Sequence, residues 1–243
     1  PSKYRKIMKH KKKHESIQFW AMGESAGGLQ YCWLFSVDSP DEAVGKIHRA
    51  VMDHVKRLPK NTGYVLYMDN LFSSAKLFRE IKDEGHRACG TSHVNHGGDP
   101  KIDAIKSTNG KPNPAAVAAG VHEQGTWTWS QHKTDGMGHY AWFDSGICHL
   151  LTNFHLPDST VVKRRKKKCP GRIEVGAPLC AHEYNIFMTA IDDVDRVREL
   201  CSTRLRVFKW YWAIFFFLID TILNNTFTCW VKHTSDKKMA RRW

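Results

Sequence analysis

Residues 63–74 constrain the fold of this chain most, because an apolar run changes there into a polar turn and then into a helical pattern. Tyr64–Met68 predicts a short buried strand that stops at Asp69. Ser73 or Ser74, followed by apolar residues at helical spacing, predicts the start of a helix. A sheet would fix an acid at this strand end while the loop leaves it open, so Asp69 is a candidate metal ligand or simply the cap of the turn.

The composition is that of a folded, basic protein. The chain has 243 residues, 42% of them hydrophobic, which is enough for one large domain or two small ones with a core. Its formal charge is +13, and Lys and Arg gather at residues 9–13, 163–168 and 237–242. Such clusters suit a polyanion, either nucleic acid or an anionic membrane surface, although a single cluster is also typical of a solvated loop.

Cysteine usage and the longest apolar run bear on the compartment. The 7 cysteines form no Cys-x-x-Cys pair, which argues against a structural zinc site. Without a secretory leader, this pattern predicts reduced thiols in the nucleus or cytosol. Asp220 and Asn224 interrupt the apolar run 210–219, so we expect a buried helix too short to span a bilayer, and no membrane partner.

The other local patterns predict alternating strands and helices. Residues 16–24 and 29–37 predict two strands joined as a hairpin. Residues 93–126 have little periodicity and are expected to be a loop or insertion, and the strands after it a second small sheet. The remaining expected elements are a helix over 41–58, a helix ending near 84, strands over 87–91, 127–130, 140–143 and 146–152, a basic loop over 163–168, and helices over 181–200 and 208–229.

Acids near strand ends are candidates for a two-metal site. Two divalent cations about 3.5–4 Å apart can clamp the attacking and leaving oxygens of a phosphodiester, and they need carboxylates from separate elements. Glu24 and Asp69 both follow predicted strands, so they would lie side by side if those strands were neighbours in one sheet. Asp192 or Asp195, one helical turn apart, would complete the set from a helix. Solvated acids are common in such positions, so spacing alone leaves both interpretations open.

A competing motif surrounds Ser25. Residues 23–28, Gly-Glu-Ser-Ala-Gly-Gly, match the Gly-x-Ser-x-Gly nucleophile elbow of serine esterases. An elbow serine leads into a helix, whereas an alternating aromatic strand pattern follows here. The segment His96-Gly97-Gly98 is similar to an oxyanion loop but comes after the serine instead of before it. We therefore interpret Ser25 as a hairpin turn residue and keep a serine hydrolase as the less favoured alternative.

Ordered motifs along most of the chain resemble the piggyBac transposase family and the domesticated proteins derived from it. Residues 67–74, Tyr-Met-Asp-Asn-Leu-Phe-Ser-Ser, resemble the family's Asp-Asn-aromatic-Phe-Thr-Ser block, and a Gly-Thr strand follows at residues 90–91. Residues 184–195 resemble its Tyr-Asn-x-x-Met-Gly-Gly-Val-Asp-x-x-Asp block. Further similar segments lie in the same order at residues 1–4, 19–25, 158–165 and 202–225.

This resemblance implies an α/β fold with an RNase H-like core, in which helices flank a mixed sheet. The core would comprise residues 1–92 and 156–243, and a small β-rich insertion would occupy residues 93–155. The implied chemistry is nicking of DNA by activated water followed by strand transfer, with Mg²⁺ or Mn²⁺ as cofactor. The implied partner is DNA in the nucleus, and a homodimer is left open. Carried over position by position, the resemblance gives as metal-binding acids Glu24, Asp69, Asp192 and the auxiliary Asp195. It gives as DNA contacts Arg204, Arg206, Lys209 and Trp210. Trp210 also fits a position in a core helix.

The departures from the family pattern predict weakened catalysis. Glu24 stands where the family has Asp, and the extra methylene moves the carboxylate by about 1.5 Å. A misplacement of that size can cost about 100-fold in rate. Thr189 and Ala190 replace two glycines before the third acid, which would crowd the helix entry. The family's amino-terminal dimerisation and DNA-binding region and its cysteine-rich zinc module are not recognisable here, so we expect a degenerate or domesticated core, or a fragment of one. Two alternatives are open, a domain with residual metal-dependent cleavage and a catalytically inactive DNA- or chromatin-binding protein.

Overall fold

The chain divides into two compact units. The computed structural model describes residues 5–7, 15–17, 19–25, 30–35, 45–165, 171–203 and 209–234. We call Ile47–Met188 the sheet unit, and Pro1–Lys46 with Thr189–Trp243 the hairpin unit. The predicted helix over 181–200 is interrupted at this division, because α5 (Leu179–Phe187) belongs to the sheet unit and α6 (Ala190–Leu200) to the hairpin unit.

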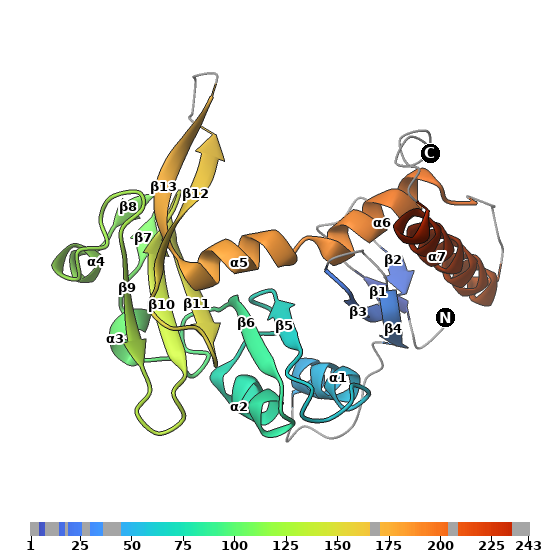
Figure 1. Cartoon of the computed structure of the whole chain (residues 1–243), viewed down its shortest axis with the longest axis horizontal. Helices are drawn as coiled ribbons and strands as arrows, with labels where there is room; N and C mark the ends of the chain where they lie inside the picture. The colour runs from blue at the N-terminus through green and yellow to red at the C-terminus, as the bar shows by residue number, and fades with distance from the viewer. Residues whose placement is uncertain are drawn as a thin grey trace. The chain divides into compact units, whose positions relative to one another are not determined.

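The sheet unit is built on a five-stranded mixed sheet in the order β5-β6-β11-β10-β9 (Figure 1). The first pair, β5 (Val65–Met68) and β6 (Arg87–Thr91), runs parallel, and the remaining pairs run antiparallel. The other strands are β9 (Trp127–Gln131), β10 (Gly138–Phe143) and β11 (Ile147–Thr152). The prediction of these strands is confirmed, but their assignment to a second sheet is wrong, because β11 pairs with β6. Every residue of β10 is buried, as in a central strand with neighbours on both sides.

Helices α1 (Lys46–Val55) and α2 (Ala75–Asp83) pack on the β5–β6 end of the sheet (Figure 1). The helix start predicted at residue 73 or 74 is confirmed, because the Ser74 side chain accepts the Leu77 N–H and caps α2. The apolar face of α2, which includes Phe78 and Ile81, is fully buried. Helix α2 thus provides the crossover that a parallel pair of strands requires.

Within the sheet unit, a β-hairpin and α5 pack against another part of the five-stranded sheet. The hairpin pairs β12 (Ser159–Arg165) with β13 (Arg172–Pro178), and its buried Val162 and Val175 join a core that includes Tyr140 of β10. The prediction of a basic loop from residue 163 is wrong for residues 163–165, which lie in β12. Exposure varies along this end of the strand, because Val162 is buried, Lys163 and Arg165 are exposed, and Arg164 between them is half-buried. Residues 166–168 of the predicted loop lie outside the described residues.

The segment predicted to be a loop, residues 93–126, contains short ordered elements. These are α3 (Pro100–Asp103), β7 (Ser107–Thr108), β8 (Lys111–Pro112) and α4 (Pro114–Ala118). Asp99 and Asn113 cap the two helices, and a proline follows each cap. Helices of four or five residues have too few turns to show a 3.6-residue period, so the sequence pattern could not reveal them.

The hairpin unit contains two antiparallel strand pairs and two helices. β1 (Arg5–Ile7) pairs with β2 (Glu15–Ile17), and β3 (Phe19–Gly23) pairs with β4 (Gln30–Phe35), which confirms the predicted hairpin. Helix α6 packs against β3 and against α7 (Trp210–His233). The ring of Phe19 stacks on Phe217 of α7 at 4.7 Å, and the Arg198 guanidinium lies 4.1 Å from the same ring.

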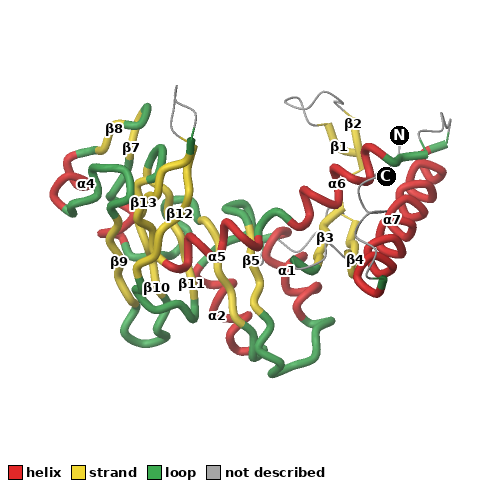
Figure 2. The backbone as a smooth tube through the Cα atoms, turned by 45° about the horizontal axis from the view of Figure 1, so that its top comes forward, coloured by secondary structure: helices red, strands yellow, loops and turns green. Residues whose placement is uncertain are grey.

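Helix α7 is one continuous helix of 24 residues (Figure 2). Among the described residues it is the one helix long and apolar enough, by length and composition, to cross a membrane, with a mean hydropathy of 1.4. The prediction of a buried helix that is too short to span a bilayer is therefore wrong, since 17% of that apolar window is buried. Asp220 does not interrupt the helix, because it is buried and accepts the Thr203 N–H at 3.3 Å. Length and composition alone assign no membrane to this chain.

Candidate functional site

Asp69 lies at the carboxyl edge of the parallel strands β5 and β6. It directly follows β5, and Thr91 ends β6 at the same edge, beside Gly90, which is opposite Met68. Asp69 Oδ1 accepts the Asn70 N–H at 2.6 Å and the Thr91 hydroxyl at 3.4 Å. The residue is exposed, and among the described residues Oδ2 has no hydrogen bond. The edge therefore holds a carboxylate with one braced oxygen and one open to a ligand.

The turn after Asp69 is fixed by its own backbone. The Asp69 carbonyl oxygen accepts the N–H groups of Phe72 and Ser73 at 3.0 and 3.2 Å. The Ser73 hydroxyl donates to the same oxygen at 3.1 Å. A Cβ at Gly90 would overlap the Met68 carbonyl oxygen and Ser73 Oγ, so glycine is required where β6 passes under this turn.

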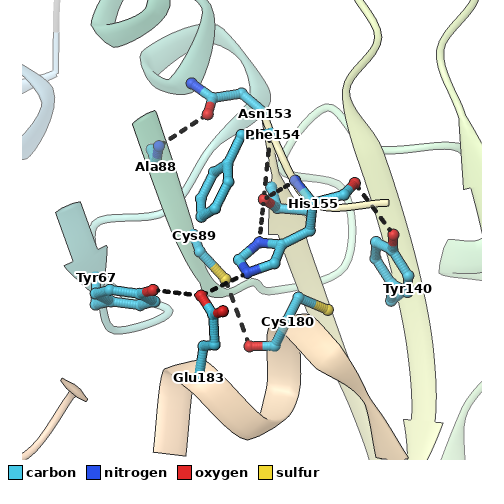
Figure 3. Close-up of polar contacts among 10 residues, drawn as sticks. Tyr67, Ala88, Cys89, Tyr140, Asn153, Phe154, His155, Cys180 and Glu183 are labelled. Atoms are coloured by element: carbon cyan, nitrogen blue, oxygen red, sulfur yellow. Dashed lines mark hydrogen bonds and ion pairs between the residues drawn. The ribbon is translucent and has the colours of Figure 1, made fainter. Parts of the chain in front are cut away.

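A partly buried hydrogen-bond network ties α5 to the strand that precedes Asp69 (Figure 3). Glu183 Oε2 of α5 accepts the Tyr67 hydroxyl at 2.8 Å and His155 Nε2–H at 2.9 Å. Thr152 Oγ1 already accepts the N–H groups of Phe154 and His155, so its hydroxyl proton goes to His155 Nδ1 at 2.8 Å. This bond fixes the tautomer of His155, with its proton on Nε2.

Burial and hydrogen bonding set the protonation of this network. Burial would raise the pKa of Glu183, but the hydrogen bonds from Tyr67 and His155 outweigh it and lower that pKa. Burial lowers the pKa of His155 despite the Glu183 carboxylate, and burial followed by the bond to Glu183 raises the pKa of Tyr67. At neutral pH the network is a carboxylate held by a neutral imidazole and a phenol, which positions β5 without contacting a ligand.

A cavity of about 340 Å³ lies beside the Asp69 edge. Thr91 and Tyr184 line it, and their hydroxyls are 3.3 Å apart. On another wall Arg164 donates to the Asp144 carboxylate at 3.0 Å and lies 5.4 Å from the Trp142 ring. Since Asp144 already neutralises Arg164, this cation by itself does not make a phosphate site.

The other candidate acids belong to the hairpin unit, and two of them, Glu24 and Asp195, are held in ion pairs. Glu24 follows β3, and its Oε2 accepts a hydrogen bond from Lys232 Nζ of α7 at 2.7 Å. On α6, Asp195 pairs with Arg198 at 2.8 Å. Asp192 is exposed in the first turn of α6, where its negative charge interacts favourably with the dipole of the helix. Of Glu24, Asp192 and Asp195, Asp192 is thus the acid with the fewest restraints.

The motifs at Asp69 and Asp192 extend to a match over most of the chain. A sequence model of the transposase IS4 family matches residues 2–227. The chain belongs to this transposase family. The sequence is 27% identical over 179 residues to the PiggyBac transposable element-derived protein 3 of Homo sapiens, across 72% of this chain and 27% of that protein. The identity to the Chimeric ERCC6-PGBD3 protein of Homo sapiens is also 27%, across 15% of that protein. The predicted resemblance to piggyBac transposases and their derivatives is confirmed.

A solved structure shares the fold of this transposase-family chain. It is the piggyBac transposase synaptic complex with hairpin DNA, with a TM-score of 0.74 and 14% identity across 98% of this chain and 45% of that chain. At this identity the likeness shows the fold alone, a mixed α/β arrangement with a five-stranded sheet. The chain spans about a quarter, or less, of the length of the curated relatives it matches.

Glu24 and Asp69 follow strands that belong to different sheets. Glu24 follows β3 of a two-stranded sheet, whereas Asp69 follows β5 of the five-stranded sheet, so the condition of neighbouring strands in one sheet is not met. Strand-end acids were identified correctly from local patterns, but those patterns carry no information on which strands pair. Asp69 belongs to the sheet unit, and Glu24, Asp192 and Asp195 to the hairpin unit. The roles of these four acids stay predictions.

The predicted DNA contacts are described in part. Lys209 and Trp210 are exposed at the start of α7, and the Lys209 ammonium lies 5.8 Å from the Tyr211 ring. Trp210 therefore does not occupy a core position, and its DNA-binding role stays a prediction. Arg204 and Arg206 lie outside the described residues.

The serine motif has the context of a turn. Ser25 is exposed directly after β3, and β3 pairs antiparallel with β4. A nucleophile elbow instead leads from a strand into a helix, so the described residues around Ser25 lack the context that this chemistry requires. The interpretation of Ser25 as a turn residue in a hairpin agrees with this arrangement.

Sequence reasoning missed Thr91 and Glu183 as residues of the Asp69 edge. Thr91 lay in the Gly-Thr strand that was recognised, and the parallel register that brings it to Asp69 was the missing information. Glu183 immediately precedes the block at residues 184–195, yet nothing in its neighbours signals that it pairs with Tyr67, 116 positions away.

Proposed function

We propose that this chain is a piggyBac transposase-derived domain that binds DNA and retains at most weak metal-dependent cleavage of it. Its core is RNase H-like, and residues 93–155 are the insertion between core parts 1–92 and 156–243. It acts in the nucleus, and a homodimer is its candidate assembly. The observation that carries the proposal is Asp69, an exposed carboxylate braced at the carboxyl edge of a parallel strand pair.

The acids fit a divalent cation to different degrees. Asp69 and Asp192 offer exposed carboxylate oxygens, the ligand type that Mg²⁺ and Mn²⁺ prefer. Glu24 and Asp195 are engaged by Lys232 and Arg198, and these ion pairs would have to open first. A bound cation would lower the pKa of a water and neutralise phosphate charge. The contribution of the chain is to hold Asp69 still, through the Thr91 hydroxyl and the turn that follows.

The alternative is a DNA- or chromatin-binding protein without catalysis, and the Glu24–Lys232 ion pair favours it. An ammonium 2.7 Å from the first acid competes directly with a cation for the same oxygen. The longer side chain of Glu24 adds a displacement of about 1.5 Å relative to aspartate. Both features leave DNA binding intact, because a formal charge of +13 suits a polyanion whether or not the acids hold metal.

Metal titration and nicking assays test the proposal. The chain, its Asp69→Asn variant and the control Asp83→Asn, an exposed acid at the end of α2, would be titrated with Mn²⁺ by calorimetry. We expect Asp69→Asn to weaken Mn²⁺ binding and abolish nicking of supercoiled plasmid, and Asp83→Asn to match the parent. DNA affinity, measured by fluorescence anisotropy, should be the same in all three.

Two further variants separate the alternatives. Glu24→Asp combined with Lys232→Gln shortens the first acid and removes its competitor, so it should raise nicking if the acid site is retained. DNA binding without nicking in every variant, including this one, would establish the inactive binding protein. Absence of DNA binding in the parent chain would refute both versions of the proposal.

A further inference from the structure

A second cluster of potential metal ligands lies in the sheet unit, on residues that the transposase chemistry does not use. It consists of Asp103 at the end of α3, His139 on β10 and His149 on β11, and we call it the buried triad. Their exposed fractions are 8%, 3% and 7%. In the antiparallel register His139 is opposite Leu151, so His149 is its diagonal neighbour on the same face. Three elements thus bring one carboxylate and two imidazoles together.

The inner atoms of the triad face one another without partners. One potential ligand atom from each of the three residues lies within 4.8 Å of those of the other two. Within the described part of the chain, Asp103 Oδ1, His139 Nε2 and His149 Nδ1 have no hydrogen-bond partner. The contact between Asp103 and His139 is 3.9 Å, too long for a hydrogen bond. A buried polar atom of this kind destabilises the folded state unless a ligand or another partner satisfies it.

The outer atoms are held by backbone groups. Asp103 Oδ2 accepts the Asn95 N–H at 3.1 Å. His149 Nε2–H donates to the Ile105 carbonyl at 2.9 Å, which leaves the lone pair of that ring on Nδ1, inside the triad. Ligand histidines in metal sites are oriented in this way by an outer acceptor. Burial, then the nearby His149, lowers the pKa of His139 to about 4, and burial also lowers that of His149, so both rings are neutral at pH 7.

We propose that the buried triad binds one divalent transition-metal ion of the zinc type through Asp103 Oδ1, His139 Nε2 and His149 Nδ1. Nitrogen and oxygen ligands bind zinc at about 2.0–2.2 Å, so ligand atoms in a tetrahedral site lie about 3.3–3.6 Å apart. Side-chain movements of about 1 Å would therefore close the triad around the ion. Mixed imidazole and carboxylate ligands favour zinc over magnesium.

His139 must exchange its tautomer when the ion binds. The Asp99 N–H donates to His139 Nδ1 at 3.0 Å, so the neutral ring carries its proton on Nε2. Metal binding at Nε2 moves this proton to Nδ1, with no net release, and Nδ1–H then needs an acceptor in place of the Asp99 N–H. A flip of the Gly98–Asp99 peptide would present the Gly98 carbonyl instead. Glycine is required here, since a Cβ at Gly98 would overlap the His139 ring. The free energy of binding a structural zinc ion outweighs the loss of one such hydrogen bond.

A metal ion here would be structural. It would link the segment that contains Asn95 and α3 to strands β10 and β11, next to the core cluster that includes Ile102, Ile105 and Phe143. The proposal is independent of Asp69, because the triad uses none of the candidate acids.

Zinc titration of the chelator-treated chain tests this site. We expect one tight site, with the ion raising the melting temperature, because an ion that binds the folded state stabilises it. Asp103→Asn keeps the shape of the side chain and should weaken zinc binding by about 100-fold or more, since even partners outside the ligand set are worth about 10–100-fold. The controls are His122→Ala, an exposed histidine of the same unit, and Asp69→Asn, and both should bind like the parent.

Cobalt substitution identifies the ligand type. Co²⁺ in the triad should show visible absorption without a thiolate charge-transfer band, which a cysteine site would show. Failure of the parent chain to take up zinc would overturn the proposal, and so would equal zinc binding by Asp103→Asn and His122→Ala. If Asp103→Asn does not fold, an unchanged melting temperature of the parent on adding zinc or chelator would overturn it equally.

Discussion

Asn153 joins three elements beneath the Asp69 edge, and its replacement by alanine should destabilise the sheet unit strongly. Its Oδ1 accepts the Ala88 N–H of β6 at 2.8 Å (Figure 3). Its Nδ2 donates to the Phe78 carbonyl of α2 at 2.9 Å. Asn153→Ala would leave the fully buried Ala88 N–H without an acceptor, at a cost of about 1–3 kcal/mol. The Phe78 carbonyl lies inside α2 and keeps its helical partner, so the second loss is about 1 kcal/mol. The expected total is about 2–4 kcal/mol.

Urea denaturation measures this loss. The denaturation midpoint should fall while the m-value stays constant, which indicates lost stability without a change in the surface exposed on unfolding. Gln124→Ala is the control, because its exposed amide makes a single 3.4 Å bond to Asp144 and should change stability by less than about 0.5 kcal/mol. A loss below about 0.5 kcal/mol for Asn153→Ala would refute the assignment of the Ala88 N–H to this side chain.

Two further predictions concern the same edge. Gly90→Ala should lower the free energy of unfolding by about 1–3 kcal/mol and weaken Mn²⁺ binding, because the added Cβ forces β6 away from β5. The control in urea denaturation is Gly45→Ala, whose new Cβ would have nothing within 4 Å. Equal stability of the two variants would contradict the packing argument. Stability should also fall with acid, because the folded-state pKa values of His155 and Glu183 are both lowered, so the unfolded chain binds more protons. The His155 contribution is lost as pH falls below its ordinary 6.5 and that of Glu183 below its ordinary 4.5. Glu183→Gln, which weakens the bonds from Tyr67 and His155, should lower the free energy of unfolding by about 1–2 kcal/mol at pH 7 after allowance for partial exposure. The loss should shrink as acid protonates Glu183 in the parent chain, and a pH-independent loss would contradict this assignment.

Local structure in this chain was predictable where the signal is local. The strand before Asp69, the Ser74 cap of α2 and the β3–β4 hairpin all rest on residues within a few positions of one another. Sheet membership was not predictable, because the pairing of Leu151 with Gly90 joins residues 61 positions apart, and alternation within a strand does not name its partner.

The site was predictable only in its most local residue. Asp69 is marked by its own strand and turn, whereas its companions Thr91 and Tyr184 depend on contacts across the sheet and α5. The buried triad was missed because Asp103 lies in a four-residue helix, and because two histidines on strands look like ordinary sheet residues until the register is known. Motif resemblance supplied the family, which no periodicity could have given.

Helix α7 has its polar side turned inward. Asp220, Thr221 and Asn224 are buried, while Ile222 and Leu223 are about 60% and 59% exposed. In water such a helix presents an exposed apolar surface, and full burial of each exposed aliphatic side chain would contribute about 1.5–3 kcal/mol of transfer free energy. The purified chain should therefore be retained strongly on hydrophobic-interaction resins and precipitate early in ammonium sulfate, despite its formal charge of +13. Handling it at low protein concentration in low-sulfate buffers, with mild detergent, follows directly from the orientation of this one helix.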